Sequence, residues 1–153
     1  MAHQTPALTF SGRHLRLDFL CLLLLLGMSA GCSSSDPIEQ QSRTAASAAQ
    51  TVSMLLDAWM GGAAPFAYTA GTLQSVSKTL ADAEAQIRSA GTAEPAKQAA
   101  LTAAVKDMSV AVARAQAGLQ AGNRAEVQNA QQDLRLASRS LSTAYSRYFA
   151  PKP

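Results

Sequence analysis

Side chains that bind metals or act as nucleophiles are scarce in this sequence. It contains two histidines, His3 and His14, and two cysteines, Cys21 and Cys32. Di-iron bundles need inward-facing Glu-x-x-His pairs, and haem bundles need axial histidines or a Cys-x-x-Cys-His attachment. From residue 33 onward the sequence has neither histidine nor cysteine. We therefore expect no metal or cofactor held by protein ligands.

A hydrolase needs a nucleophile with an activating base, and without histidine the remaining pair is a hydroxyl with a lysine. Lys78 lies between Ser77 and Thr79, with Ser75 three residues earlier. Adjacent side chains on a helix do not face each other. We interpret this cluster as a solvated lysine among solvated hydroxyls, and we expect no enzyme activity.

Charge is also sparse, because only 15% of the residues are Asp, Glu, Lys or Arg and the formal net charge is +3. The sequence contains no basic tract, which argues against a nucleic acid partner. Two pairs, Glu39 with Arg43 and Glu84 with Arg88, have the i, i+4 spacing that stabilises a helix by about 0.2 to 0.5 kcal/mol each.

The amino terminus has the order of a secretory signal. Arg13 and Arg16 precede an apolar stretch at residues 19–26, which Gly27 ends. The stretch is too short for a membrane-spanning helix, which needs about 20 apolar residues. A positive segment, a short apolar segment and a small-residue cleavage site are typical of an exported protein.

Ser29, Ala30 and Gly31 come directly before Cys32. This sequence resembles the lipobox of bacterial lipoproteins, in which the cysteine thiol is diacylated and the peptide bond before it is cut. Ser29 stands where that family usually has a branched aliphatic residue, and the resemblance covers residues 1–32 only. It implies a signal peptide at 1–31, lipidation of Cys32 and a membrane anchor formed by its acyl chains.

Residues 32–36 join the predicted anchor to the rest of the chain. The run Ser33-Ser34-Ser35 cannot bury apolar area, so we expect a flexible linker. In Gram-negative lipoproteins an Asp directly after the acylated cysteine tends to retain the protein in the inner membrane. Ser33 at this position implies an outer-membrane lipoprotein that faces the periplasm.

Residues 37–150 contain four segments in which apolar or small residues recur at alternating spacings of three and four. The four registers are Ile38, Gln41, Ala45, Ala48, Val52, Leu55 and Trp59; Phe66, Thr69, Leu73, Val76, Leu80, Ala83 and Ile87; Leu101, Val105, Met108, Val112, Ala115 and Leu119; and Val127, Ala130, Leu134, Ala137, Leu141, Ala144 and Tyr148. Strand signals are absent. The pattern predicts an all-α fold, an antiparallel up-down-up-down four-helix bundle with heptad, coiled-coil-like packing, followed by a tail at 151–153.

The first two helices have recognisable ends. Asp36 is expected to cap the first helix, with Glu39 completing an acidic capping box. Gly61 and the glycine after it end that helix. The second helix begins either at Pro65 or at Thr72, and these alternatives stay open.

The third helix is expected to have Thr92 as its cap, with Gly118 and Gly122 marking its end. The fourth begins at Asn123, a second good capping residue, and Pro151 stops it. The seams are rich in alanine, which lets the helices approach closely but contributes less burial energy than leucine.

Aromatic residues make up only 5% of the sequence, yet several are expected around one turn. Trp59, Met60, Phe66 and Tyr68 flank the Gly61 turn at the end of the first helix, about 35 Å from its start. Seam positions predict that Trp59 and Phe66 plug the open end of the core. The functional alternative is a partner surface, because aromatic residues and Met are enriched in interfaces.

Arg135 and Arg139 lie on successive turns of an outer face of the fourth helix, with Arg147 further along. They form a possible contact with anionic lipid head groups, lipopolysaccharide or cell-wall polymer. The nearby carboxylates of Glu126 and Asp133 weaken the positive potential of these arginines, and physiological salt screens surface charges within about 8 Å. A solvated face is therefore the simpler interpretation of these arginines.

Together these features predict a lipid-anchored, non-enzymatic envelope protein. Its helical bundle would serve as a structural or accessory subunit by docking on another envelope protein or by self-association. The alternative is a periplasmic binder of a small apolar ligand, held between helices where alanine layers leave room. The two differ in cavity volume, because alanine seams that close completely leave no space for a ligand.

Overall fold

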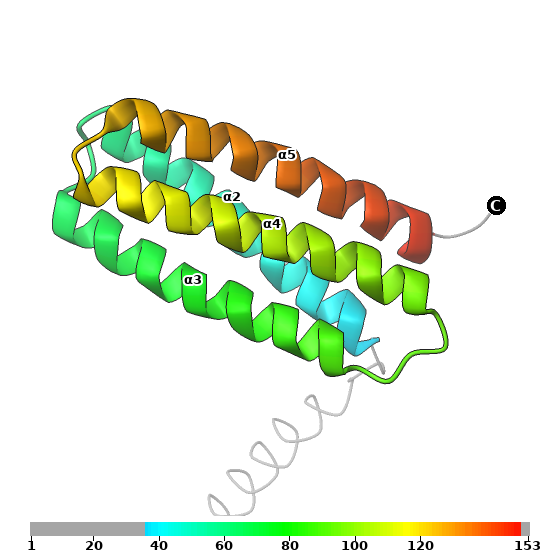
Figure 1. Ribbon diagram of the computed structural model, residues 1–153. Coiled ribbons are helices and arrows are strands. Elements are labelled where there is room, and N and C mark those ends of the chain that lie inside the picture. The colour runs from blue at the N-terminus through cyan, green and yellow to red at the C-terminus, as the bar shows by residue number, and fades with distance from the viewer. Residues whose placement is uncertain (1–35, 151–153) are drawn as a thin grey trace, which may run out of the picture. The chain divides into compact units, whose positions relative to one another are not determined.

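The computed structural model describes residues 36–150, and they form four long helices (Figure 1). The helices are α2 (Pro37–Met60), α3 (Phe66–Ser89), α4 (Pro95–Gln120) and α5 (Arg124–Phe149). No strand occurs between residues 36 and 150. The predicted signal peptide, the predicted lipidation at Cys32 and the tail at 151–153 lie outside the described residues. The predicted four-helix bundle is confirmed.

The helices run up, down, up and down, joined by short turns at residues 61–65, 90–94 and 121–123 (Figure 1). Each helix packs on the next in sequence, and α5 returns to pack on α2, while α2 also contacts α4 across the diagonal. One end of the bundle carries Asp36, the 90–94 turn and Phe149, and is called the Asp36 end. The opposite end carries the other two turns and is called the Gly61 end.

The predicted registers form the core. Nearly all of their Leu, Ile, Val and Met side chains are buried, with Leu73, Leu101 and Met108 fully enclosed. Further buried positions lie beside the registers; they include Ser42, Ala49 and Leu56 on α2 and Ala104, Ala111 and Gly118 on α4. Each helix faces more than one neighbour, so its buried stripe is wider than a two-residue seam.

The start of α2 confirms Asp36 as the cap, because its Oδ1 accepts a hydrogen bond from the Ile38 backbone N–H at 2.9 Å. The capping-box role predicted for Glu39 is wrong. The Glu39 carboxylate instead accepts hydrogen bonds from Arg43 and Tyr145, partners that stabilise it more than one backbone amide would. The predicted ion pair between Glu39 and Arg43 is therefore confirmed, as is that between Glu84 and Arg88 on α3.

The second helix begins at Phe66, directly after Pro65, so the later start at Thr72 is wrong. The Thr69 backbone N–H already donates to the Pro65 carbonyl at 3.0 Å. Thr69 is fully buried, so the first turn of α3 is packed rather than frayed.

Thr92 is not the cap of α4, which begins three residues later at Pro95. Its Oγ1 accepts a hydrogen bond from the Glu94 N–H at 3.0 Å, inside the turn. The turn is also held by Gln98, whose side-chain amide donates to the carbonyl of Ala90 at 2.9 Å. Because the Thr92 hydroxyl accepts a hydrogen bond within the turn, it does not cap α4.

Gly118 does not end α4, which continues to Gln120. A Cβ at this position would lie 3.0 Å from both Cγ2 and the backbone N of Val127, so glycine permits close approach of α5. The turn itself uses Gly122, whose φ of 62° falls in the left-handed region that favours glycine. Asn123 caps α5 as predicted, with its Oδ1 accepting from the Glu126 N–H at 3.1 Å.

Candidate functional site

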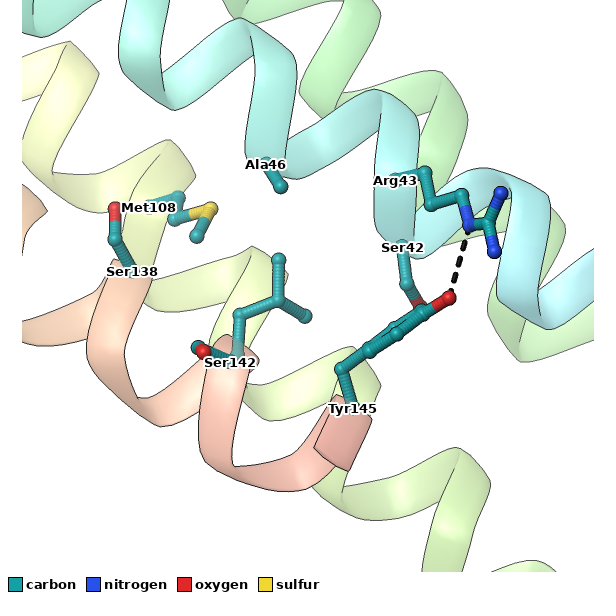
Figure 2. A pocket seen from close by; sticks show the side chains of 8 residues that line it. Ser42, Arg43, Ala46, Met108, Ser138, Ser142 and Tyr145 are labelled. Atoms are coloured by element: carbon teal, nitrogen blue, oxygen red, sulfur yellow. Dashed lines mark hydrogen bonds between the residues drawn. The ribbon is translucent and has the colours of Figure 1, made fainter. Parts of the chain in front are cut away.

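A groove of about 290 Å³ lies between α2 and α5, toward the Asp36 end of the bundle. Its lining surface is mainly apolar and comes from three helices. Leu141 of α5 contributes to it, together with Ala46 of α2 and Met108 of α4 (Figure 2). The space between these helices is therefore not completely filled here. We call this depression the α2–α5 groove.

Small hydroxyl residues leave the space between α2 and α5 unfilled. Ser42, Ser138 and Ser142 line the groove, where larger side chains would have filled it. The Ser42 hydroxyl donates to the Ile38 carbonyl at 2.7 Å, and Ser138 donates to the carbonyl four residues earlier at 2.8 Å. Because both protons are used within their own helices, these hydroxyls offer acceptor oxygens to the groove.

Tyr145 closes one end of the groove by joining α5 to α2 (Figure 2). Its hydroxyl donates to Glu39 Oε1 at 2.8 Å and accepts from Arg43 Nε at 2.9 Å. Arg43 Nη2 also donates to Glu39 at 2.6 Å, which completes a triangle of three side chains. The hydrogen bond with Tyr145 is the main effect that raises the pKa of Arg43 above its usual value, and the Glu39 carboxylate adds to it.

Farther along the α2–α5 interface, toward the Gly61 end, an amide bridges the same two helices. The Gln131 side-chain amide donates to Asp57 Oδ1 at 2.6 Å and to the Ser53 carbonyl at 3.3 Å. The α2–α5 pair is thus joined by polar contacts on both sides of the groove, while the groove itself remains apolar.

Lys97 is the one lysine that is buried among the described residues, with 7% of its surface exposed. Its Nζ lies 2.6 Å from Asp36 Oδ2 and 4.0 Å from the ring centroid of Phe149. The hydrogen bond with Lys97 lowers the pKa of the Asp36 carboxyl, against the opposing effect of its partial burial. Sequence reasoning missed Lys97, which lies seven residues before Ala104 on the buried stripe beside the third register.

At the Gly61 end the structure divides the four predicted partner-surface residues into two pairs. Trp59 and Met60 are half-buried against the core. Arg124 holds them, because its Nη2 donates to the Met60 carbonyl at 2.6 Å and its guanidinium carbon lies 5.5 Å from the Trp59 ring centroid. Phe66 and Tyr68 remain 53% and 64% exposed.

The prediction that Phe66 plugs the core is therefore wrong. Phe66 is the first residue of α3 and lies at the edge of the bundle, where α2 and α4 also end. The heptad spacing gives the side of the helix on which a residue lies, but it does not say whether the neighbouring helices extend far enough to cover it.

The three predicted anionic-contact arginines, Arg135, Arg139 and Arg147, are all exposed. Arg135 Nη2 lies 3.8 Å from Asp57 Oδ1, so part of its charge is balanced within the bundle. At about 100° per residue, Arg147 is rotated by roughly 80° from Arg139, so the three do not form one continuous face.

A second exposed apolar area, which sequence reasoning missed, lies over α4 and α5. Val110 and Leu136 are 52% and 57% exposed, and they border a hollow of about 280 Å³ between Asp107 and Asp133. In the sequence this area is marked by one apolar residue on the outer face of each helix, Val110 on α4 and Leu136 on α5.

Within residues 36–150 no three or more His, Cys, Asp or Glu side chains come together in a way that would hold a metal ion. In the same range no helix has the length and apolar character needed to cross a membrane. Comparisons of the chain with protein-family models, curated proteins and solved structures found no match.

Proposed function

We propose that this chain is a lipid-anchored envelope protein without enzymatic activity, whose helical bundle docks on another envelope protein as a structural or accessory subunit. The lipobox resemblance of residues 29–32 supports anchoring through Cys32. Ser33 after that cysteine supports outer-membrane delivery, facing the periplasm, in a Gram-negative cell.

The observation that carries the docking proposal is the exposure of Phe66 and Tyr68 at the Gly61 end. Large aromatic side chains that remain in water are costly to leave uncovered, and they are enriched at the centres of protein interfaces. Trp59 and Met60 lie on the other side of the same turn, so all four residues are at the Gly61 end, although Phe66 and Tyr68 lie on different sides of α3.

The position of this surface suits an anchored protein. The 24 residues of α2 rise about 1.5 Å each, so the helix carries the Gly61 end about 36 Å from Asp36. With the lipid on Cys32, four residues before Asp36, the aromatic surface would lie at the end of the bundle opposite the anchor point on the chain. A partner in the periplasm could reach it there.

Chemical crosslinking of intact envelopes followed by co-purification tests this proposal. The variant Phe66→Ala/Tyr68→Ala should reduce partner recovery by about tenfold or more, because aromatic residues are enriched among the few interface positions whose truncation costs about 2 kcal/mol or more. Its helicity should be unchanged, since both side chains are exposed. Met54→Ala is the matched control, because Met54 is 59% exposed on α2 and lies away from the turn.

Undiminished recovery of the partner by the double variant, with its fold intact, would remove the Gly61 end as the docking surface. Crosslinking of the chain only to further copies of itself would indicate a self-assembling scaffold in place of an accessory subunit.

A second candidate function is binding of a small apolar ligand between the helices. The observation in its favour is the α2–α5 groove, an open space between helices whose lining surface is mainly apolar, although serines, an arginine and a tyrosine contribute to it. Ligand sites combine such a lining with a few placed polar groups, and here those groups are Arg43, Tyr145 and the serine hydroxyls.

A further inference from the structure

We propose that the α2–α5 groove binds a single-chain fatty acid, with the aliphatic chain on the groove floor and the carboxylate on Arg43. This inference rests on the second candidate function and names its ligand class. It follows from the size of the groove, from the chemistry of its floor and from the donors that Arg43 has free.

The dimensions suit one unbranched chain. The groove volume of about 290 Å³ is at the lower limit of ligand pockets, which are about 300 to 1,000 Å³. The groove follows α5 from Ser138 to Tyr145, seven residues or about 10 Å. A groove of this volume and length accepts one medium-length aliphatic chain and has no room for the two chains of a phospholipid.

The floor of the groove suits methylene groups. Met108 and Leu141 lie beneath the groove as part of the buried core, and Ala46 forms the exposed α2 wall. Burying a methylene group stabilises a complex by about 0.8 kcal/mol. The hydroxyls of Ser42 and Ser138 are already bonded to their own helices, so covering them with a chain leaves no donor proton without a partner.

Arg43 supplies a cation at the Tyr145 end of the groove, and most of its donors are free. The guanidinium has five N–H groups, of which the bonds to Tyr145 and Glu39 use two, from Nε and Nη2. The Arg43 side chain is 70% exposed, so the remaining N–H groups reach solvent beside the groove. A ligand carboxylate would share this guanidinium with Glu39.

The same bundle already contains an arginine that two carboxylates share. Arg114 on α4 contacts Glu126 at 2.9 Å and also forms an ion pair with Asp133, both from α5. An arginine with one carboxylate in place can therefore take a second in this structural setting. At Arg43 the second position is not filled by any carboxylate of the described residues.

The test is a nuclear magnetic resonance titration of the ¹⁵N-labelled chain from residue 33 to 153, which contains the complete bundle and its core, without the predicted lipid. The probes are decanoate, well below its micelle concentration, and decan-1-ol, which has the same chain without the charge. We expect saturable shifts at residues lining the groove, with decanoate binding about tenfold more tightly than decan-1-ol.

Two Ala→Leu substitutions, which add side chains of the same size, test where the aliphatic chain of the probe binds. Ala46→Leu fills the groove from the α2 side and should weaken binding of both probes at least tenfold. Ala103→Leu places the same side chain on an exposed face of α4, away from the groove, and should leave both affinities unchanged. Equal affinities of the two variants would overturn the groove as the binding site.

Two further substitutions test the head-group position in opposite directions. Arg43→Gln should weaken decanoate about tenfold and leave decan-1-ol unchanged. Glu39→Gln removes the competing carboxylate and should tighten decanoate binding several-fold, again without effect on decan-1-ol. If the Glu39–Arg43–Tyr145 triangle had only a structural role, each substitution would change the affinities for decanoate and decan-1-ol equally.

The results of these titrations distinguish binding of a fatty acid from the more general binding of a small apolar ligand in the groove. If neither probe binds, both the ligand class and ligand binding in the groove are wrong. If decan-1-ol binds equally well and Arg43→Gln changes nothing, the groove binds apolar ligands but the assignment of a fatty acid is wrong.

Discussion

Lys97 Nζ lies 2.6 Å from Asp36 Oδ2, and this contact joins the first residue of the bundle to the first turn of α4. The same ammonium lies over the ring of Phe149 near the end of α5. Asp36 also caps α2, so one carboxylate holds both a helix start and a buried cation. In a lipid-anchored chain, this is the point at which the linker would pass into the bundle.

The stability of the bundle should therefore depend on pH through Asp36. Its pKa is lowered in the folded state, chiefly by Lys97. The resulting stabilisation is fully present above the unfolded-state pKa of about 3.9 and is lost as the pH falls through the lower folded-state pKa. Melting temperatures measured from pH 7 to pH 2 should show a difference between the wild type and Asp36→Asn that narrows below about pH 4.

Comparison with Asp36→Asn separates this effect from that of the other carboxylates, which titrate in both proteins. A difference in melting temperature that stayed constant across this pH range would contradict the Asp36–Lys97 contact as its source.

The register of α5 predicts contrasting effects at two neighbouring positions. Leu134 is 2% exposed, and Gln132 is exposed on the outer face. Leu134→Asp buries an unpaired charge and should cost more than about 4 kcal/mol, enough to unfold a small domain, whereas Gln132→Asp should change stability by less than about 0.5 kcal/mol. Circular dichroism during heating provides the measurement, and similar melting temperatures would show that the register is wrong.

Two glycines within helices should respond oppositely to alanine. At Gly118 a Cβ would lie 3.0 Å from two atoms of Val127, so Gly118→Ala should cost about 1 to 3 kcal/mol by forcing α4 and α5 apart. At Gly71, in α3, a Cβ would meet nothing within 4 Å. Gly71→Ala should stabilise the bundle by up to about 1 kcal/mol. Urea denaturation of the two variants measures both changes, and destabilisation by Gly71→Ala or stabilisation by Gly118→Ala would refute this account of the helix contacts.

The fold was predictable because the alternating spacing of three and four recurs in all four segments, and two capping residues, Asp36 and Asn123, act through contacts within a few residues of sequence. Thr92 and Gly118 were misassigned for the opposite reason. A hydroxyl or a glycine near a helix end fits several local geometries, and the choice between them depends on where the neighbouring helix lies.

Less of the candidate site could be predicted from the sequence. The small residues Ser42, Ala46 and Ser142 lie beside the predicted registers, and spacing gives the direction of a side chain but not the distance between helices. The contact of Tyr145 with Glu39 joins residues 106 positions apart. Neither residue carries a local pattern that marks the other as its partner.

The proposed lipid anchor makes a further prediction at Cys32. In the lipoprotein family diacylation of the thiol precedes cleavage, so Cys32→Ser should leave a longer, unprocessed chain. Immunoblotting of whole cells distinguishes the two forms by size. A variant processed as efficiently as the wild type would show that an ordinary signal cleavage site is used instead.

The most direct test of the central claim is mass spectrometry of the amino-terminal peptide of the protein purified from envelopes. We predict a chain that begins at Cys32 and carries acyl groups on that residue. A free thiol at Cys32, or an amino terminus at another residue, would contradict the proposal that this bundle is lipid-anchored.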